Sequence, residues 1–168
     1  MPQDFYGRLA RLAARRGQHF VLDTLSEALK PALGHGVTLI KPSLGELEGL
    51  LGRTVRDWRE QEAEALALVR AGAARYVVVS LGAEGAILAW EKGVLRLPAP
   101  KVVVRSTVGA GDSFIAGMIL GLSRGDAPED AFALGIAAGA ATVMTYGTAH
   151  LLLTDTEALY RQIALPTP

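Results

Sequence analysis

Hydrophobic and polar residues along this chain follow two spacings in turn, one typical of helices and one typical of strands. Apolar residues recur at helical spacing at Phe5, Leu9 and Leu12. Helices are predicted over residues 4–16, 25–33, 44–51, 57–71, 112–122, 128–145 and 157–165, strands over 20–23, 37–41, 76–81, 86–90, 94–97 and 102–105, and residues 166–168 are predicted to be frayed. This alternation predicts an α/β domain of three layers, in which a mostly parallel sheet carries helices on both faces.

Two of the predicted strands carry further information. Residues 76–81 read Tyr-Val-Val-Val-Ser-Leu, a continuous β-branched run that is typical of a strand buried on both faces of a parallel sheet. Residues 20–23 are apolar apart from Asp23, a composition that suits an interior strand better than a charged, protected edge. We therefore expect this strand either to pair with a second copy of the chain or to pair with another chain.

Residues 131–149 contain no charged side chain and are about long enough to span a bilayer. The stretch is dominated by Ala, Gly and Thr, so its transfer into lipid would gain little. A buried helix that packs closely on a sheet or a ligand is the better interpretation. No membrane association is expected.

The composition narrows the functional class. The chain has 168 residues, which is consistent with one domain and a sizeable core. Seventeen basic and seventeen acidic residues give a formal net charge of zero, which argues against nucleic acid as a partner. The sequence has no cysteine and opens with a polar segment that does not resemble a signal peptide, so a cytoplasmic location is expected.

The strongest chemical signal is the sequence Ser-Thr-Val-Gly-Ala-Gly-Asp-Ser over residues 106–113, which leads directly into a predicted helix. Glycines let successive backbone N–H groups point at one anion, and the helix N-terminus adds its positive dipole end. Asp112 has two interpretations at this stage. It caps the helix, or it accepts a hydroxyl proton beside a phosphate that the amides hold.

Two other segments each have an ordinary interpretation and a functional one. Residues 41–46 read Lys-Pro-Ser-Leu-Gly-Glu after a predicted strand, and the Ser43 and Glu46 pair has the spacing of a helix capping box. Residues 80–85 read Ser-Leu-Gly-Ala-Glu-Gly at the end of the buried strand. Taken alone, the second segment is a plain exit from strand to loop.

Together, the three segments resemble the ribokinase-like PfkB carbohydrate kinases in order and spacing, from about Leu9 to Gly147. The residues at 106–108 are most similar to the branch that contains 6-phosphofructokinase, 1-phosphofructokinase and tagatose-6-phosphate kinase. The resemblance implies ATP-dependent phosphorylation of a sugar phosphate, with Mg²⁺ and K⁺ as cofactors. One departure is Ser43, which stands where the family has Asn.

The resemblance also assigns roles to individual residues. Asp112 would be the catalytic base, and the amides of Gly109, Ala110 and Gly111 would form the anion hole. The residues implied to bind nucleotide are Lys41, Ser43, Ser80, Leu81, Gly82 and Gly85, with Ile136 and Ala140 lining the adenine pocket. Glu46 would organise Mg²⁺ indirectly, and K⁺ would lie among Ser106, Val108, Thr142, Thr145 and Gly147.

In this family an N-terminal half with the sugar-binding residues and a lid comes first, and the resemblance implies that this chain lacks it. The chain would then be weak or inactive alone, and would act as a homodimer or with a chain that supplies the missing half. The alternative is a catalytically silent nucleotide-binding or oligomerisation module, and a misplaced start codon is a third possibility. A Rossmann dinucleotide site and a Walker P-loop are disfavoured because their glycine and lysine patterns are absent from the sequence.

Overall fold

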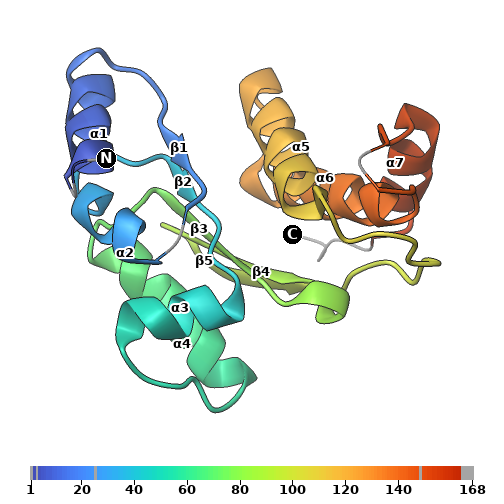
Figure 1. Ribbon diagram of the computed structural model, residues 1–168, viewed down its shortest axis with the longest axis horizontal. Helices are drawn as coiled ribbons and strands as arrows, with labels where there is room; N and C mark the ends of the chain where they lie inside the picture. Colours follow the sequence, from blue (N-terminus) through green and yellow to red (C-terminus); the bar gives the residue numbers. More distant parts are fainter. Residues whose placement is uncertain (1, 3, 25, 148, 164–168) are drawn as a thin grey trace. The chain divides into compact units, whose positions relative to one another are not determined.

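A computed structural model describes residues 2, 4–24, 26–147 and 149–163, which fall into two compact units (Figure 1). The first unit comprises residues 1–81 and 87–96, and the second comprises residues 82–86 and 97–168. The predicted helix start at Leu25, the predicted helix end at Leu165 and the predicted fraying of residues 166–168 lie outside the described residues. The expectation that residues 1–168 form one domain stays a prediction.

A five-stranded sheet forms the centre of the first unit. Its strands are β1 (Val21–Leu22), β2 (Leu39–Ile40), β3 (Tyr76–Ser80), β4 (Ala86–Trp90) and β5 (Gly93–Leu97), and they lie side by side in this order. β1 pairs with β2 and β2 pairs with β3, both in parallel. The connection between β4 and β5 is only two residues long, so these strands form a hairpin.

Helices of the first unit pack on this sheet through a shared apolar core. They are α1 (Phe5–Arg15), α2 (Ser26–Leu29), the 3-10 helix η1 (Lys30–Ala32), α3 (Leu44–Leu51) and α4 (Trp58–Arg70). Val77 and Val79 of β3 lie in this core together with Leu47 of α3, and all three are fully buried. Val78 points away from that core because side chains alternate along a strand, and it is also fully buried. The prediction that β3 is buried on both faces is confirmed.

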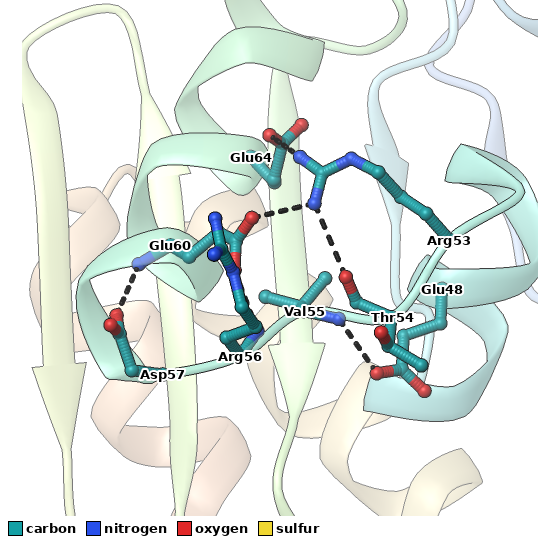
Figure 2. A network of polar contacts seen from close by, with 8 residues as sticks. All are labelled: Glu48, Arg53, Thr54, Val55, Arg56, Asp57, Glu60 and Glu64. Atoms are coloured by element: carbon teal, nitrogen blue, oxygen red, sulfur yellow. Dashed lines mark hydrogen bonds and ion pairs between the residues drawn. The ribbon is translucent and has the colours of Figure 1, made fainter.

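The loop between α3 and α4 is held by a network of polar contacts around Arg53 (Figure 2). The guanidinium of Arg53 reaches Glu60 Oε1 at 2.6 Å and Glu64 Oε1 at 2.5 Å. Glu48 Oε1 accepts a hydrogen bond from the backbone N–H of Val55 at 2.8 Å. α3 and α4 thereby fix the loop from both sides, and these charges serve the structure of the first unit.

Three helices dominate the second unit: α5 (Ala110–Arg124), α6 (Pro128–Val143) and α7 (Leu153–Tyr160), with the short 3-10 helix η2 at Gly82–Glu84. α5 and α6 approach closely at glycines. A Cβ placed on Gly117 would lie 2.9 Å from the carbonyl oxygen of Leu134, and one placed on Gly135 would lie 2.9 Å from that of Phe114. Residues 131–143 of the uncharged stretch are therefore part of a largely buried helix, α6, whose close neighbour is another helix. No described helix is both long and apolar enough to cross a membrane.

Two element predictions are wrong. Residues 102–105 do not form a strand, because Val103 and Val104 are 74% and 60% exposed and the N–H of Arg105 bonds to the carbonyl of Val143 at 2.7 Å. α7 begins at Leu153, four residues before the predicted start at Glu157, and ends at Tyr160, so the described residues 161–163 are not helical as predicted. Thr156 is buried within the helix, and its Oγ1 donates to the carbonyl of Leu152 at 3.2 Å.

Candidate active site

In the first unit, the segment after β2 lies beside the end of β3. Ser43 and Ser80 form an isolated parallel bridge, and the N–H of Ser80 donates to the carbonyl of Pro42 at 3.0 Å. Parallel strands bring their carboxyl ends to one edge of a sheet, and ligands of α/β proteins bind at such edges. The structure thus brings together two of the three segments that the sequence singled out.

Lys41 directly follows β2, and its ammonium group is nearly buried. The side chain of Lys41 is 8% exposed, and its Nζ lies 3.4 Å from Oδ2 of Asp23, which follows β1. A buried cation needs such a partner, because desolvation without one is costly. Asp23 belongs to no motif in the sequence, and its position at the end of a predicted strand was the one signal that could have indicated this contact.

The capping box at the start of α3 is present. Ser43 Oγ accepts a hydrogen bond from the N–H of Glu46 at 3.3 Å, and Glu46 Oε2 accepts from the N–H of Ser43 at 2.7 Å and from its hydroxyl at 2.9 Å. The ordinary interpretation of this motif is therefore confirmed. The capping box also limits a role of Glu46 near Mg²⁺, because its Oε2 already accepts two hydrogen bonds from Ser43.

In the second unit, the glycine-rich turn forms the N-terminus of α5. Gly109 is the N-cap residue, with a left-handed φ of 78°, a conformation that favours glycine. Asp112 lies three positions further, in the first turn of the helix, whose N-cap residue is a glycine and has no side chain to cap it. Asp112 is exposed.

A pocket of about 420 Å³ opens beside this turn. Its lining residues are Val108, Gly109, Asp112, Ser113, Thr142, Ala149, His150 and Leu151. The volume is in the range of small-molecule sites, and the lining combines apolar walls with one carboxylate and one imidazole. His150 belongs to no motif in the sequence, and the fold places it in the pocket that Asp112 lines.

The residues implied to surround K⁺ come from two segments of the second unit. The N–H groups of Arg105 and Ser106 both donate to the carbonyl of Val143, at 2.7 and 3.3 Å, so residues 105–108 lie against the end of α6. The hydroxyls of Thr142 and Thr145 donate to carbonyls at 2.9 Å, which leaves lone pairs on their oxygens. An all-oxygen donor set of this kind suits a hard cation.

The other predicted nucleotide residues have more ordinary surroundings. Ile136 and Ala140 are buried on α6, and neither lines the pocket. Leu81 packs on the core of the first unit. Gly82 and Gly85 belong to the second unit, where a Cβ on Gly85 would lie 2.1 Å from the carbonyl oxygen of Leu97. Packing alone explains the glycine at position 85.

Among the described residues, no group of three or more His, Cys, Asp or Glu side chains could hold a metal ion. Mg²⁺ usually keeps several waters and binds through one or two carboxylates together with the phosphates of a substrate. The acidic side chain of Glu46 suits an indirect role of this kind, through water. The donor set therefore fits a nucleotide-borne Mg²⁺ rather than a cage made by the protein.

Comparisons with known proteins agree with the family resemblance seen in the sequence. Residues 1–155 match the pfkB family carbohydrate kinases. The chain is 38% identical over 164 residues to the ATP-dependent 6-phosphofructokinase isozyme 2 of Mycobacterium tuberculosis, covering 98% of this chain and 48% of that protein. It is 34% identical over 145 residues to the 1-phosphofructokinase of Bacillus subtilis, covering 86% of this chain and 48% of the relative.

Among solved structures, phosphofructokinase-2 of Escherichia coli in complex with substrates and products superimposes with a TM-score of 0.92 at 32% identity, covering 97% of this chain and 53% of that one. The same enzyme in complex with potassium also gives a TM-score of 0.92. The ribokinase-like α/β fold predicted from the sequence is thus confirmed. The chain spans about half the length of the curated relatives it matches. With the family match covering most of its residues, the chain belongs to the pfkB family of carbohydrate kinases.

Proposed function

We propose that this chain supplies the nucleotide-binding and catalytic-base part of an ATP-dependent kinase that phosphorylates a hydroxyl group of a sugar phosphate. The observation that carries the proposal is the position of Asp112, exposed in the first turn of α5 and lining a pocket beside the amides of Gly109–Gly111. The names of the relatives, 6-phosphofructokinase and 1-phosphofructokinase, and the fructose-6-phosphate complex of the Escherichia coli enzyme support the substrate class.

In this proposal Asp112 accepts the proton of the attacking sugar hydroxyl. The amides at the start of α5 stabilise the charge that develops on the transferred phosphoryl group, since donors there are already oriented and the helix dipole favours an anion. The residues proposed to bind the nucleotide are Lys41, Ser43, Ser80, Leu81, Gly82, Gly85, Ile136 and Ala140.

Two cations belong to the proposal. Mg²⁺, held by the nucleotide phosphates and indirectly by Glu46, would neutralise charge on those phosphates. K⁺ would lie among the oxygens of Ser106, Val108, Thr142, Thr145 and Gly147. The potassium complex of the Escherichia coli enzyme supports a monovalent cation in this family.

The free edge of the sheet supports a protein partner. β1 is the first strand of the sheet order, and in the described part of the chain it pairs with β2 alone. Val21 is half-buried and uncharged, so the edge lacks the charge that protects isolated edges from pairing. We propose that this edge pairs with a second copy or with a chain that completes the sugar site, in the cytoplasm. Light scattering at micromolar concentration tests this, and a monomer that binds no partner would contradict it.

The test of the activity is release of ADP from Mg²⁺-ATP with K⁺ present, across fructose 6-phosphate, fructose 1-phosphate and tagatose 6-phosphate. We expect sugar-dependent release, and a loss of about 10²- to 10⁴-fold in Asp112→Asn with ATP affinity nearly unchanged. ATP binding without sugar-dependent release would support the silent nucleotide-binding module instead. Equal loss of turnover and ATP affinity in Asp112→Asn would contradict the role of base.

A further inference from the structure

Arg105 and Tyr146 form a stacked pair on the surface of the second unit. The guanidinium carbon of Arg105 lies 4.6 Å from the centre of the Tyr146 ring, and its Nη1 donates a hydrogen bond to the Tyr146 hydroxyl. Tyr146 is 71% exposed, so no core packing holds its ring in place. Both residues adjoin the candidate site, because Arg105 precedes Ser106 and Tyr146 follows Thr145.

The backbone makes a second link at the same point. Val143 is the last residue of α6, where carbonyl oxygens have no partner within the helix. Its carbonyl accepts the N–H groups of both Arg105 and Ser106, at 2.7 and 3.3 Å. Main chain and side chains therefore join the segment before the glycine-rich turn to the segment that follows α6.

Hydrogen bonds between residues close in sequence extend this constraint into the turn. Ser106 Oγ accepts from the N–H of Val108 at 3.2 Å, and the carbonyl of Thr107 accepts from the N–H of Ala110 at 3.4 Å. Gly109, between these residues, has a left-handed backbone that non-glycine residues rarely adopt. The orientation of the amides at 109–111 thus depends on where residues 105 and 106 are held.

We propose that Arg105 and Tyr146 are positioning residues, a clasp that holds residues 105–108 against the end of α6 and so preorganises the anion-binding amides of the turn. The role of the amides rests on the proposed function, whereas the clasp itself rests on the contacts. A turn that is already ordered loses less conformational freedom when an anion binds, which favours affinity.

A monovalent cation among Ser106, Val108, Thr142 and Thr145 would join the same two segments. The clasp and such a cation are then partly redundant, and the positive guanidinium disfavours a second cation nearby. Loss of the clasp should consequently increase the effect of K⁺ on the order of the turn. A purely structural role of Arg105 in overall stability would leave the K⁺ dependence unchanged.

Hydrogen exchange of the complete chain tests the clasp without any substrate. We compare the wild type with Arg105→Gln and Tyr146→Ala, and use Arg75→Gln as the matched control, since Arg75 stacks on Tyr76 at 5.2 Å in the first unit. We expect amides 106–111 to exchange about threefold to tenfold faster in the two clasp variants, and KCl to reverse part of this more than choline chloride does. The control should match the wild type at these amides.

A conservative variant separates the two side-chain contacts. Tyr146→Phe keeps the ring under the guanidinium and removes only the hydroxyl, so it should exchange more slowly than Tyr146→Ala at amides 106–111. Unchanged exchange at these amides in Arg105→Gln, with the protein folded as judged by exchange elsewhere, would overturn the proposal.

Calorimetric titration with Mg²⁺-ATP provides the functional measurement. We expect the dissociation constant of Arg105→Gln to rise about threefold to tenfold in choline chloride, and less in KCl. Faster exchange with an unchanged dissociation constant would overturn the preorganisation. A wild type that binds no nucleotide, with the exchange pattern as expected, would instead overturn the proposed function and leave the clasp in place.

Discussion

Lys41 Nζ lies 3.4 Å from Oδ2 of Asp23, and the two residues follow adjacent parallel strands of the sheet. The ammonium is nearly buried, whereas the carboxylate is 34% exposed. The two partners therefore depend on each other unequally. If Lys41 were removed, water could solvate the carboxylate of Asp23. If Asp23 were removed, little water could reach the ammonium of Lys41.

Asp23→Ala should destabilise the protein more than Lys41→Met does. Removing Asp23 leaves a buried ammonium without its counter-charge, at a cost of about 1–3 kcal/mol in the free energy of unfolding. Lys41→Met removes the buried charge itself and keeps an apolar stem of similar length. Urea unfolding of both variants measures the difference. A larger loss in Lys41→Met would show that Asp23 is not the residue that compensates the charge.

Two substitutions in the capping box of α3 can separate its contribution to stability from the proposed role of Glu46 in Mg²⁺ binding. Ser43→Ala removes the acceptor for the N–H of Glu46 and should cost about 0.5–2 kcal/mol in unfolding free energy. Glu46→Gln keeps an amide oxygen that can accept from the N–H of Ser43, because Gln also occurs in capping boxes. We expect Glu46→Gln to unfold at nearly the wild-type urea concentration and yet to need more Mg²⁺ to bind ATP. An unchanged Mg²⁺ requirement would show that Glu46 caps the helix and has no role in binding Mg²⁺-ATP.

Most elements of the fold were predictable because local signals decided them. α3 was predicted with its observed bounds, since Ser43 begins the helix and Gly52, left-handed with φ of 69°, ends it. β3 was predicted from its β-branched run alone. In such segments local propensity and tertiary packing agree, so the pattern is sufficient.

Failures occurred where a contact distant in the sequence decided the structure. Residues 102–105 have strand composition, but the carbonyl of Val143 at the end of α6 accepts the N–H of Arg105, and the side chains of Val103 and Val104 stay exposed. His150 and Asp23 carry no local motif, and only the fold places them beside Asp112 and Lys41. The family motifs identified the glycine-rich turn, but could not reveal these neighbours.

The close approach of α5 and α6 predicts an asymmetry between two glycines. A Cβ on Gly117 would lie 2.9 Å from the carbonyl oxygen of Leu134 and 3.0 Å from Cβ of Ala138, so Gly117→Ala should destabilise by about 1–3 kcal/mol. Gly45 on α3 is the matched control. It is exposed with no atom within 4 Å of an added Cβ, and Gly45→Ala should stabilise by about 0.5–1 kcal/mol through helix propensity. Stabilisation by both substitutions would show that the helices can separate at no cost.

The network around Arg53 predicts a dependence of stability on pH (Figure 2). The pKa of Glu60 lies below its ordinary value of 4.5, because its carboxylate accepts the backbone N–H of Arg56 and the guanidinium of Arg53. A carboxylate with a depressed pKa in the folded state stabilises the protein above its unfolded pKa, and this contribution is lost as the pH falls through the folded pKa.

Glu60→Gln should therefore unfold at a lower urea concentration than the wild type near about pH 7, and the gap should narrow as the pH falls below 4.5. Glu91→Gln is the control, since Glu91 is exposed in the turn between β4 and β5, away from the network. The difference between Glu91→Gln and the wild type in the urea concentration of unfolding should be small at every pH. If the Glu60→Gln gap were constant down to about pH 3, the loss would reflect the geometry of the hydrogen bonds rather than the charge of the carboxylate. Glu60 would then act as a neutral acceptor, and Arg53 would owe its fixed position to Glu64.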